Sequence, residues 1–152
     1  SVASLQPPYS MLERGVEDGL LEYCLEEGIG VIVYSPMQKG LLTGKFSGER
    51  VENLPKNDHR RQDSHFQEPE LSANLRLVRG LRSIAEKRGK TAAQLAIAWV
   101  LRRPELTAAI VGARRPSQIE ETASVGDWVL SGEDTRAINA LLDERQKVLN
   151  RS

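Results

Sequence analysis

The sequence predicts an α/β protein with a parallel sheet. Two short and continuously apolar runs are typical of strands that helices cover on both faces, Val31-Ile32-Val33-Tyr34 and Ala108-Ala109-Ile110-Val111. Segments with helical periodicity lie between them, and this alternation favours parallel strands joined by crossover helices. A polar cluster also follows each predicted strand, which is where α/β proteins place their ligands.

The first third of the chain adds a weaker strand and one helix. Residues 2–6 predict a third strand, and a helix that ends at Gly28 follows it. The apolar residues of this helix have the spacing of one buried face: Val16, Leu20, Tyr23 and Cys24. Residues 47–69 are rich in Gly, Pro and charge. This segment is too long for a plain connector, so we expect a functional loop for cofactor or substrate.

Four helices are predicted in the remainder. Apolar positions place one from Leu71 to Gly89, and a capping box at Thr91 and Gln94 starts the next, which runs to about residue 102. Pro116 suits the first turn of a helix to about residue 125, and the last follows Ser131. Three strands alone would leave both sheet edges exposed. We therefore expect the chain to be a fragment that needs further strands.

Composition excludes several classes of protein. The 152 residues are 39% hydrophobic and 28% charged, as in ordinary globular proteins. Lys and Arg number 21 and so do Asp and Glu, so no overall attraction to nucleic acid or anionic membrane is expected. Cys24 is the single cysteine, which excludes an internal disulfide. No apolar run approaches the roughly 20 residues that span a bilayer, and we expect a cytoplasmic protein.

The three polar clusters together resemble the aldo-keto reductase family. The cluster from Tyr34 to Lys45 is similar to the family's aromatic-Ser-Pro-Leu…Gly-Leu-Leu-Thr-Gly-Lys pattern, and residues 112–122 to its Gly-Ala-x-x-x-x-Gln-x-x-Glu-Asn pattern. The first cluster is Leu5-Gln6-Pro7-Pro8-Tyr9-Ser10, and residues 91–99 also match a family helix. The resemblance runs from end to end. It implies the C-terminal portion of a (β/α)8 TIM barrel, namely the last three βα units with the closing helix.

The resemblance implies NADP(H) as cofactor, and two strand-end residues suit its nicotinamide. Gln6 carries an amide that donates and accepts together, so it can match the carboxamide; the alternative is a glutamine in a surface turn. Tyr34 offers a flat face for stacking, as the family aromatic does; the alternative is a core aromatic at the end of a buried strand. There is no Gly-x-Gly-x-x-Gly, so the Rossmann mode of binding is not expected.

The pyrophosphate is expected on the turn that follows Tyr34. Backbone N–H groups and a hydroxyl would wrap it, with Gly40 permitting close approach, from Ser35, Pro36, Met37, Gln38, Lys39 and Gly40. Three of these depart from the commonest family residues, but backbone contacts should survive that: Met37, Gln38 and Lys39. The resemblance makes Lys45 a second cationic contact. The alternative is a solvated lysine.

The cluster after the last strand suits a phosphate. Gly112 and Arg114 precede a helix that Pro116 begins, so a guanidinium and a positive helix end would converge on one anion. In the family this region holds the adenosine 2′-phosphate. Gln118 and Glu121 would face the adenosine, and Thr122 stands where asparagine is usual and touches the adenine. Arg115 either shares the phosphate or is solvated, and both alternatives stay open.

The loop at 47–69 supplies one more expected contact. Family members place there an arginine that folds over the cofactor, and Arg60 is our candidate, with Arg61 as the alternative. His59 and His65 are expected in solvent, and no second pair gives metal-ligand spacing, so no metal site is predicted. Cys24 and Trp99 lie on apolar helical faces and are assigned to the core.

No catalytic residue is expected in this chain. Carbonyl reduction needs an acid for the developing alkoxide, and the family supplies a tyrosine with lysine, aspartate and histidine from the first half of its barrel. Nothing here matches these four. The prediction is therefore an inactive C-terminal part of an NADP(H)-dependent aldo-keto reductase that reduces aldehydes or ketones. The alternatives are a non-catalytic NADP(H) sensor of the same fold, like the channel-associated family members, and a fragment without ligand affinity.

The expected partners follow from that prediction. The full-length parent would bind a small carbonyl substrate, while nucleic acid and membrane are not expected. The exposed sheet edges should be covered either by a second copy of the chain or by the missing N-terminal half.

Overall fold

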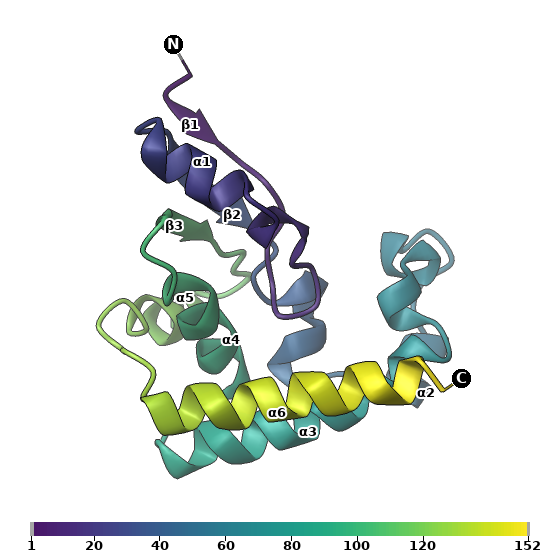
Figure 1. Ribbon diagram of the computed structural model, residues 1–152. Helices are drawn as coiled ribbons and strands as arrows, with labels where there is room; N and C mark the ends of the chain where they lie inside the picture. Colours follow the sequence, from purple (N-terminus) through teal and green to yellow (C-terminus); the bar gives the residue numbers. More distant parts are fainter. Residues whose placement is uncertain (1, 152) are drawn as a thin grey trace. The chain divides into compact units, whose positions relative to one another are not determined.

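The computed structural model describes residues 2–151 (Figure 1). The chain divides into two compact units. One is built from the residues up to Gln38 together with Gln94–Leu130, and the other from Lys39–Ala93 together with the residues from Ser131 onward. The predicted strands all fall in the first unit, and the predicted functional loop falls in the second.

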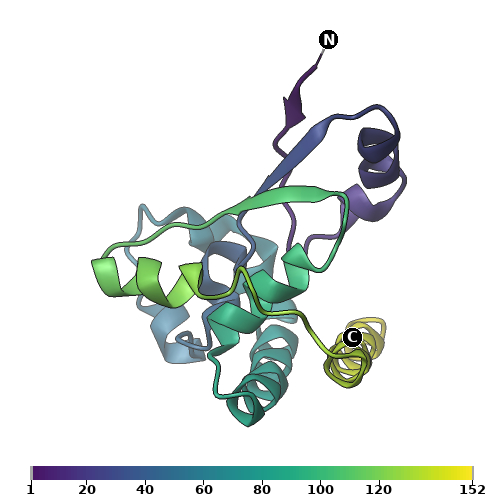
Figure 2. The same cartoon turned by 90° about the vertical axis from the view of Figure 1, so that its left-hand side faces the viewer.

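A three-stranded parallel sheet forms the first unit. Its strands lie side by side in sequence order, β1 (Ser4–Leu5), β2 (Gly30–Tyr34) and β3 (Leu106–Ile110) (Figure 2). The predicted fold class and strand order are therefore confirmed, although β3 begins two residues earlier than its apolar run. Val31 and Val33 are fully buried. Their burial fits the central place of β2, which pairs with β1 on one side and with β3 on the other.

The helix predicted between β1 and β2 is broken in two. A 3-10 turn, η1 (Gly15–Glu17), precedes α1 (Leu20–Glu26), because Gly19 between them adopts φ 85° and starts a new helix. The break changes the phase of the buried face. Leu21 and Cys24 are buried, whereas Leu20 and Tyr23 are exposed by 39% and 55%, so the predicted face was wrong at Leu20 and Tyr23 and right at Val16 and Cys24.

Trp99 is among the largest fully buried side chains. It lies on α4 (Ala92–Leu101), is fully buried, and packs against Tyr9 with ring centroids 5.4 Å apart. The guanidinium of Arg102 lies 3.6 Å from the centroid of the Trp99 ring. The prediction that Trp99 and Cys24 are core residues is confirmed.

Tyr9 is a structural residue. Its hydroxyl donates to Glu17 Oε1 at 2.5 Å and accepts from Arg102 Nη1 at 3.2 Å. Burial, with the hydrogen bond to Glu17, raises the pKa of Tyr9 to about 12. The hydroxyl therefore stays protonated and links the segment after β1 to the end of α4.

Two long antiparallel helices form the second unit. The start of α3 (Glu70–Lys87) lies beside the end of α6 (Gly132–Leu149), and Arg88 pairs with Asp134 at 2.9 Å where α3 ends and α6 begins (Figure 1). Gly80 permits close packing between them. A Cβ on it would lie 2.7 Å from the methyl carbons of Leu141.

The predicted long loop is folded into short helical turns. It contains α2 (Gly48–Glu52), η3 (His59–Gln62) and η4 (Ser64–Phe66), and it follows the irregular turn η2 (Gln38–Thr43). Side-chain oxygens accept from the backbone at the start of each turn: those of Ser47, Asp58 and Asp63. Phe66 is buried and packs edge-on against Phe46 at 5.3 Å. Residues 47–69 are therefore an ordered segment of short helical turns, with Phe66 packed against Phe46.

Candidate functional site

The polar clusters of the first unit follow the carboxyl ends of its three strands, which lie at one end of the sheet. The chain continues beside β2 after β1 ends: Tyr34 N–H donates to the Pro7 carbonyl at 3.1 Å, and Tyr9 N–H to the Tyr34 carbonyl at 3.2 Å. On the other side Tyr34 is in register with Ile110. The residues that follow these three positions therefore project from the carboxyl ends of adjacent parallel strands, where α/β proteins bind ligands.

The two residues predicted for the nicotinamide are both exposed. Tyr34 retains 44% of its accessible surface, so it is not a core aromatic as the alternative had it. Gln6 is likewise open to solvent. The exposed ring at the end of β2 offers a stacking face, and the exposed amide directly after β1 offers a hydrogen-bond donor and acceptor.

The turn after β2 is strained. Ser35 and Gln38 have φ of 56° and 45°, the left-handed region that costs non-glycine residues on the order of 1–3 kcal/mol. Gln38 N–H donates to the Ser35 carbonyl at 2.9 Å and closes the turn. Such strain persists only where the surroundings hold it, and it concentrates at ligand sites.

Three side chains of this turn face the protein. Pro36 is buried, and Met37 packs against the core cluster on α4. Gln38 is 6% exposed, and its Oε1 accepts from Ser10 Oγ at 2.7 Å. Ser10 also accepts from the N–H groups of Leu12 and Glu13, so it fixes two segments at once. Any ligand contact from these three positions must come from the backbone, as the sequence analysis expected.

The second unit begins with the remaining residues of the predicted phosphate turn. Lys39 and Gly40 have φ of 54° and 93°, and Gly40 lies against Phe46. Lys39 Nζ donates to Asp63 Oδ2 at 2.6 Å. Burial would raise the pKa of Asp63, but hydrogen bonds from Lys39 and His65 outweigh it and hold that pKa below its ordinary value. Lys39 is therefore already paired within the protein.

The loop arginines are also engaged. Arg60 donates through Nε to Asp58 Oδ1 at 2.9 Å and lies over Phe46, 5.2 Å from the ring centroid. Hydrogen bonds from Arg60 hold the pKa of Asp58 well below its usual range. Arg61 donates to the carbonyl of Leu54 at 2.8 Å. By contrast Lys45 is exposed and makes no ion pair within residues 2–151.

The histidines of this loop differ from each other. His59 is exposed, as predicted. His65 is not: its side chain is 15% exposed, and Nδ1 lies 2.9 Å from Asp63 Oδ1. The prediction for His65 was wrong because η4 packs against α3, where His65 Nε2 lies 4.0 Å from Glu70 Oε2.

The cluster after β3 presents unpaired charge. Gly112, Arg114 and Arg115 are exposed, and neither guanidinium makes an ion pair in the part of the chain that is described. They precede α5 (Pro116–Ala123), whose start coincides with the predicted one. Two adjacent cations at a helix N-terminus form a favourable place for an anion.

Gln118 has a role that the sequence analysis did not assign. Its Oε1 accepts from the backbone N–H groups of Arg114 and Arg115 at 2.7 and 3.1 Å. The amide oxygen thereby fixes the bend that carries both guanidinium groups. The Nε2 donors are the part of this side chain that remains suited to a ligand.

Glu121 and Thr122 lie on the next turn of α5 and are half-buried. Gln94 donates to the Glu121 carbonyl at 2.9 Å, and Thr122 Oγ1 donates to the Gln118 carbonyl at 2.8 Å. Thr122 also lines an open, mainly apolar hollow of about 470 Å³ between α4, β3 and α5, with Leu101 and Ile119 among its walls. The predicted adenine contact therefore borders an apolar surface.

Two findings concern other kinds of site. Across residues 2–151, no three His, Cys, Asp or Glu side chains come together in a way that suits a metal ion. None of the described helices is both long and apolar enough to cross a membrane.

The residues that hold the loop together were not predicted from the sequence. Asp58 and Asp63 each accept from the backbone N–H two residues later, at Arg60 and His65. The pattern Asp-x-Arg or Asp-x-His in a polar segment is the signal that was available, since Asp commonly forms such turns. No local pattern marked the hydrogen bond between Ser10 and Gln38 or the one between Arg145 and Asn74, because the partners are distant in sequence.

The comparisons with known proteins agree on one family. The sequence model of the Aldo/keto reductase family matches residues 1–143. Aldo-keto reductase YhdN of Bacillus subtilis is 36% identical over 92% of this chain and 42% of its own length. A probable voltage-gated potassium channel subunit beta of Arabidopsis thaliana is 36% identical over 82% of this chain and 38% of its own length. The chain thus spans about two fifths of these relatives.

The fold is also similar to that of a solved structure. The glycerol dehydrogenase AKR11B4 from Gluconobacter oxydans superposes with a TM-score of 0.85 at 34% identity. The match covers 94% of this chain and 43% of that one.

Proposed function

Because the chain belongs to the aldo/keto reductase family, we propose that it supplies the cofactor-binding face of an NADP(H)-dependent reductase of aldehydes or ketones. The observation that carries the proposal is the exposed pair Arg114 and Arg115, which have no ion-pair partner in the described chain and stand at the start of α5. A charge of this kind, left without a partner beside a helix N-terminus, suits a phosphate.

The remaining residues fit the other parts of a dinucleotide. Exposed Tyr34 would stack on the nicotinamide and Gln6 would bond its carboxamide. The strained turn at Ser35 would offer its hydroxyl and backbone to the pyrophosphate. Lys39 and Lys45 would add positive charge. The cofactor, when bound, supplies the hydride, and this chain's residues would bind and orient it.

Specificity for the phosphorylated cofactor would come from the cluster after β3. A guanidinium at Arg114 meets a 2′-phosphate but finds only a hydroxyl on the unphosphorylated cofactor. Gln118 holds the bend that carries Arg114, so the backbone at this position is fixed before a ligand arrives. Thr122 borders the apolar hollow beside which an adenine would lie.

We propose further that this chain alone does not reduce carbonyl compounds. None of its tyrosines has the setting of a proton donor. Tyr9 is buried with a raised pKa, and it bonds to Glu17. Tyr34 is exposed at the end of β2, where it would stack on the nicotinamide, and Tyr23 lies on the exposed side of α1. A positioned acid typically contributes about 10²- to 10⁴-fold in rate, so its absence alone would leave negligible activity.

The proposed partner is the rest of a barrel. Both sheet edges, at β1 and β3, are unpaired within the described residues. Exposed apolar side chains accompany the β3 edge, with Ile110 at 46% and Ile119 at 59%. The 470 Å³ hollow beside β3 is likewise lined mainly by apolar atoms. An unpaired edge beside an apolar hollow favours further strands and helices over solvent.

The experiment that tests the function is a titration of NADPH into the chain, followed by nicotinamide fluorescence, with NADH as the matched ligand. Binding that prefers NADPH supports the proposal. No binding by the chain alone, but binding once the family's N-terminal half is co-expressed, supports it as well. No binding in either preparation would refute it, and light scattering of the same samples distinguishes pairing with that half from self-association.

A second candidate function has one specific support. The channel subunit of Arabidopsis thaliana is as similar to this chain as the Bacillus subtilis reductase is, with 36% identity to each. A cofactor-binding subunit without catalysis would use the same residues. Carbonyl reduction by the completed barrel, measured as NADPH oxidation, separates a reductase from such a sensor.

A further inference from the structure

We propose that Arg145 and Asn74 are positioning residues that orient the ammonium group of Lys39 through His65 and Asp63. The inference rests on the proposed function in one respect, that Lys39 receives an anionic group. All five residues belong to the second unit, and four direct contacts join them in a line. The line begins on the last helix and ends on the phosphate turn.

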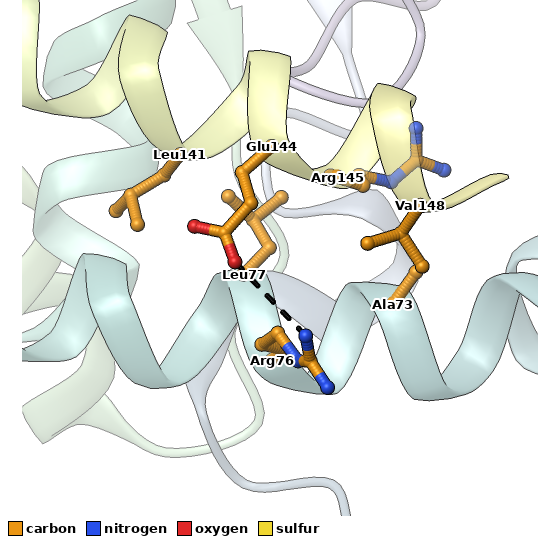
Figure 3. A pocket seen from close by; sticks show the side chains of 7 residues that line it. All are labelled: Ala73, Arg76, Leu77, Leu141, Glu144, Arg145 and Val148. Carbon is orange, nitrogen blue, oxygen red and sulfur yellow. Dashed lines mark ion pairs between the residues drawn. The ribbon is translucent and has the colours of Figure 1, made fainter. Parts of the chain in front are cut away.

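Arg145 is the unusual residue with which the line begins. It lies beside the crevice between α3 and α6, in which Arg76 and Glu144 form an ion pair at 4.0 Å (Figure 3). Those two side chains are 64% and 60% exposed, whereas that of Arg145 is 12% exposed. Burial lowers the pKa of Arg145, against the favourable charge of Glu70 3.5 Å away. A guanidinium buried to this degree needs defined polar partners.

Asn74 connects Arg145 to the loop segment that contains His65. It is fully buried on α3, and both ends of its amide are used. Its Oδ1 accepts from Arg145 Nε at 2.5 Å, and its Nδ2 donates to the His65 carbonyl at 2.9 Å. Because the amide is fixed on one side by Arg145, its donor has one direction, and the turn η4 is held at that place.

Asp63 divides its two oxygens between the loop and the lysine. Oδ1 accepts from His65 N–H at 3.0 Å and lies 2.9 Å from His65 Nδ1. Oδ2 accepts from Lys39 Nζ at 2.6 Å. The position of His65 therefore sets the position of the Asp63 carboxylate, and that carboxylate sets the direction of the Lys39 ammonium group.

The contact with Asp63 affects anion binding because the Lys39 side chain is flexible. A lysine stem has many rotamers, and ordering it at the moment of binding weakens the net affinity. Its backbone is also in the left-handed region, with φ 54°. A side chain already held by Asp63 has been ordered before an anion arrives. We call this line of contacts from Arg145 to Lys39 the relay. It would tune the affinity for an anion from α6, a helix that lies outside the phosphate turn.

The first test needs no cofactor. In the chain carrying Asn74→Asp, the acceptor for Arg145 is kept, but the donor to His65 becomes a carboxylate. We expect the NMR titration of the Asp63 carboxyl to move up toward its ordinary pKa, and amide exchange at residues 58–66 to accelerate several-fold. Arg145→Met should do the same and Arg145→Lys should restore much of it. Arg76→Met, in the same crevice but exposed, is the matched control and should leave both readings unchanged.

The second test joins the relay to the ligand. Asn74→Asp should weaken NADPH binding by about 2- to 10-fold, which lies within the range in which packed networks modulate a distant site. In a Lys39→Met background the same substitution should have no further effect. An unchanged Asp63 titration in folded Asn74→Asp and Arg145→Met overturns the relay whatever NADPH does. Additive losses in the double variant overturn the role of Lys39. Failure of every form to bind NADPH refutes the proposed function instead and leaves the first test to decide the relay.

Discussion

Two cationic segments of this chain differ in whether their charge is already satisfied. After β3, Arg114 and Arg115 are exposed and make no ion pair among the described residues. In the second unit, Lys39 pairs with Asp63 at 2.6 Å, and Arg60 pairs with Asp58. The sequence patterns of the two segments predicted the same kind of ligand. The structure shows two different electrostatic states.

The difference separates recognition from placement. An anion that reaches Arg114 gains the whole charge of the guanidinium, since no carboxylate competes for it. An anion that reaches Lys39 must share the ammonium with Asp63 or displace that carboxylate. We therefore expect the cluster after β3 to dominate discrimination between cofactors, while Lys39 and Arg60 contribute smaller amounts and fix the geometry of the loop.

The largest expected effect on cofactor binding comes from substitution of Arg114. In the completed barrel, Arg114→Ala should weaken NADPH binding about 10- to 100-fold, equivalent to a charged hydrogen bond of roughly 1.5–3 kcal/mol, and leave NADH nearly unchanged. Fluorescence titration with both cofactors measures it. Arg115→Ala is the companion variant, because a comparable loss there would mean that the two guanidinium groups share the phosphate. Equal losses for NADPH and NADH in Arg114→Ala would show that this residue does not contact the 2′-phosphate.

A smaller effect should come from Gln118, which acts on the bend rather than on charge. Gln118→Ala removes the acceptor for the N–H groups of Arg114 and Arg115, and such terminal acceptors contribute about 1 kcal/mol. Amide exchange at those two positions should rise about fivefold. Gln118→Glu keeps an acceptor and should preserve the slow exchange, yet it should weaken NADPH by adding negative charge. Fast exchange in both variants would contradict this role.

Much of the first unit could be predicted because its signals are local. The apolar runs and Pro116 each determine the structure of their own neighbourhood, and all three strands appear in the predicted order. The misplaced face of α1 shows the limit of that reasoning. A single glycine, Gly19 at φ 85°, restarts the helix and changes which side chains are buried.

The site was predicted less completely for a related reason. A family pattern specifies which residues approach a ligand, but not which protein groups hold those residues beforehand. Asp63 is 24 positions from Lys39, and Arg145 is 71 from Asn74. Pairs so far apart leave no periodicity in the sequence, and His65 was assigned to solvent because its cover lies on another element.

Arg60 provides a comparison between two neighbouring loop cations. Since Arg60 is already bound to Asp58 and stacked on Phe46, Arg60→Ala should weaken NADPH binding only about 2- to 5-fold, within the range of partly exposed ion pairs. Arg61→Ala should matter less for the ligand, because Arg61 bonds to the Leu54 carbonyl. Titration of both variants in the completed barrel decides between them. A greater loss in Arg61→Ala would assign the cofactor contact to Arg61.

The smallest expected effect is a pH dependence at Asp63, and it tests whether the pairing of Lys39 exists in solution. The pKa of Asp63 is depressed in the folded chain, so its pairing stabilises the fold above the ordinary aspartate pKa of about 4 and is lost as pH falls through the folded value. Asp63→Asn keeps an acceptor for the turn at His65 but removes the charge. Urea unfolding should therefore show wild type to be more stable than Asp63→Asn by about 1 kcal/mol or less at pH 7, with the difference becoming smaller as pH falls below the ordinary aspartate pKa of about 4. Asp143→Asn, an exposed carboxylate of α6 with no ion pair in residues 2–151, is the matched control and should show no such crossover. A stability difference that persists unchanged at pH 3 would mean that Asp63 acts through shape alone, and the contrast between a paired and an unpaired cationic segment would then lose its electrostatic basis.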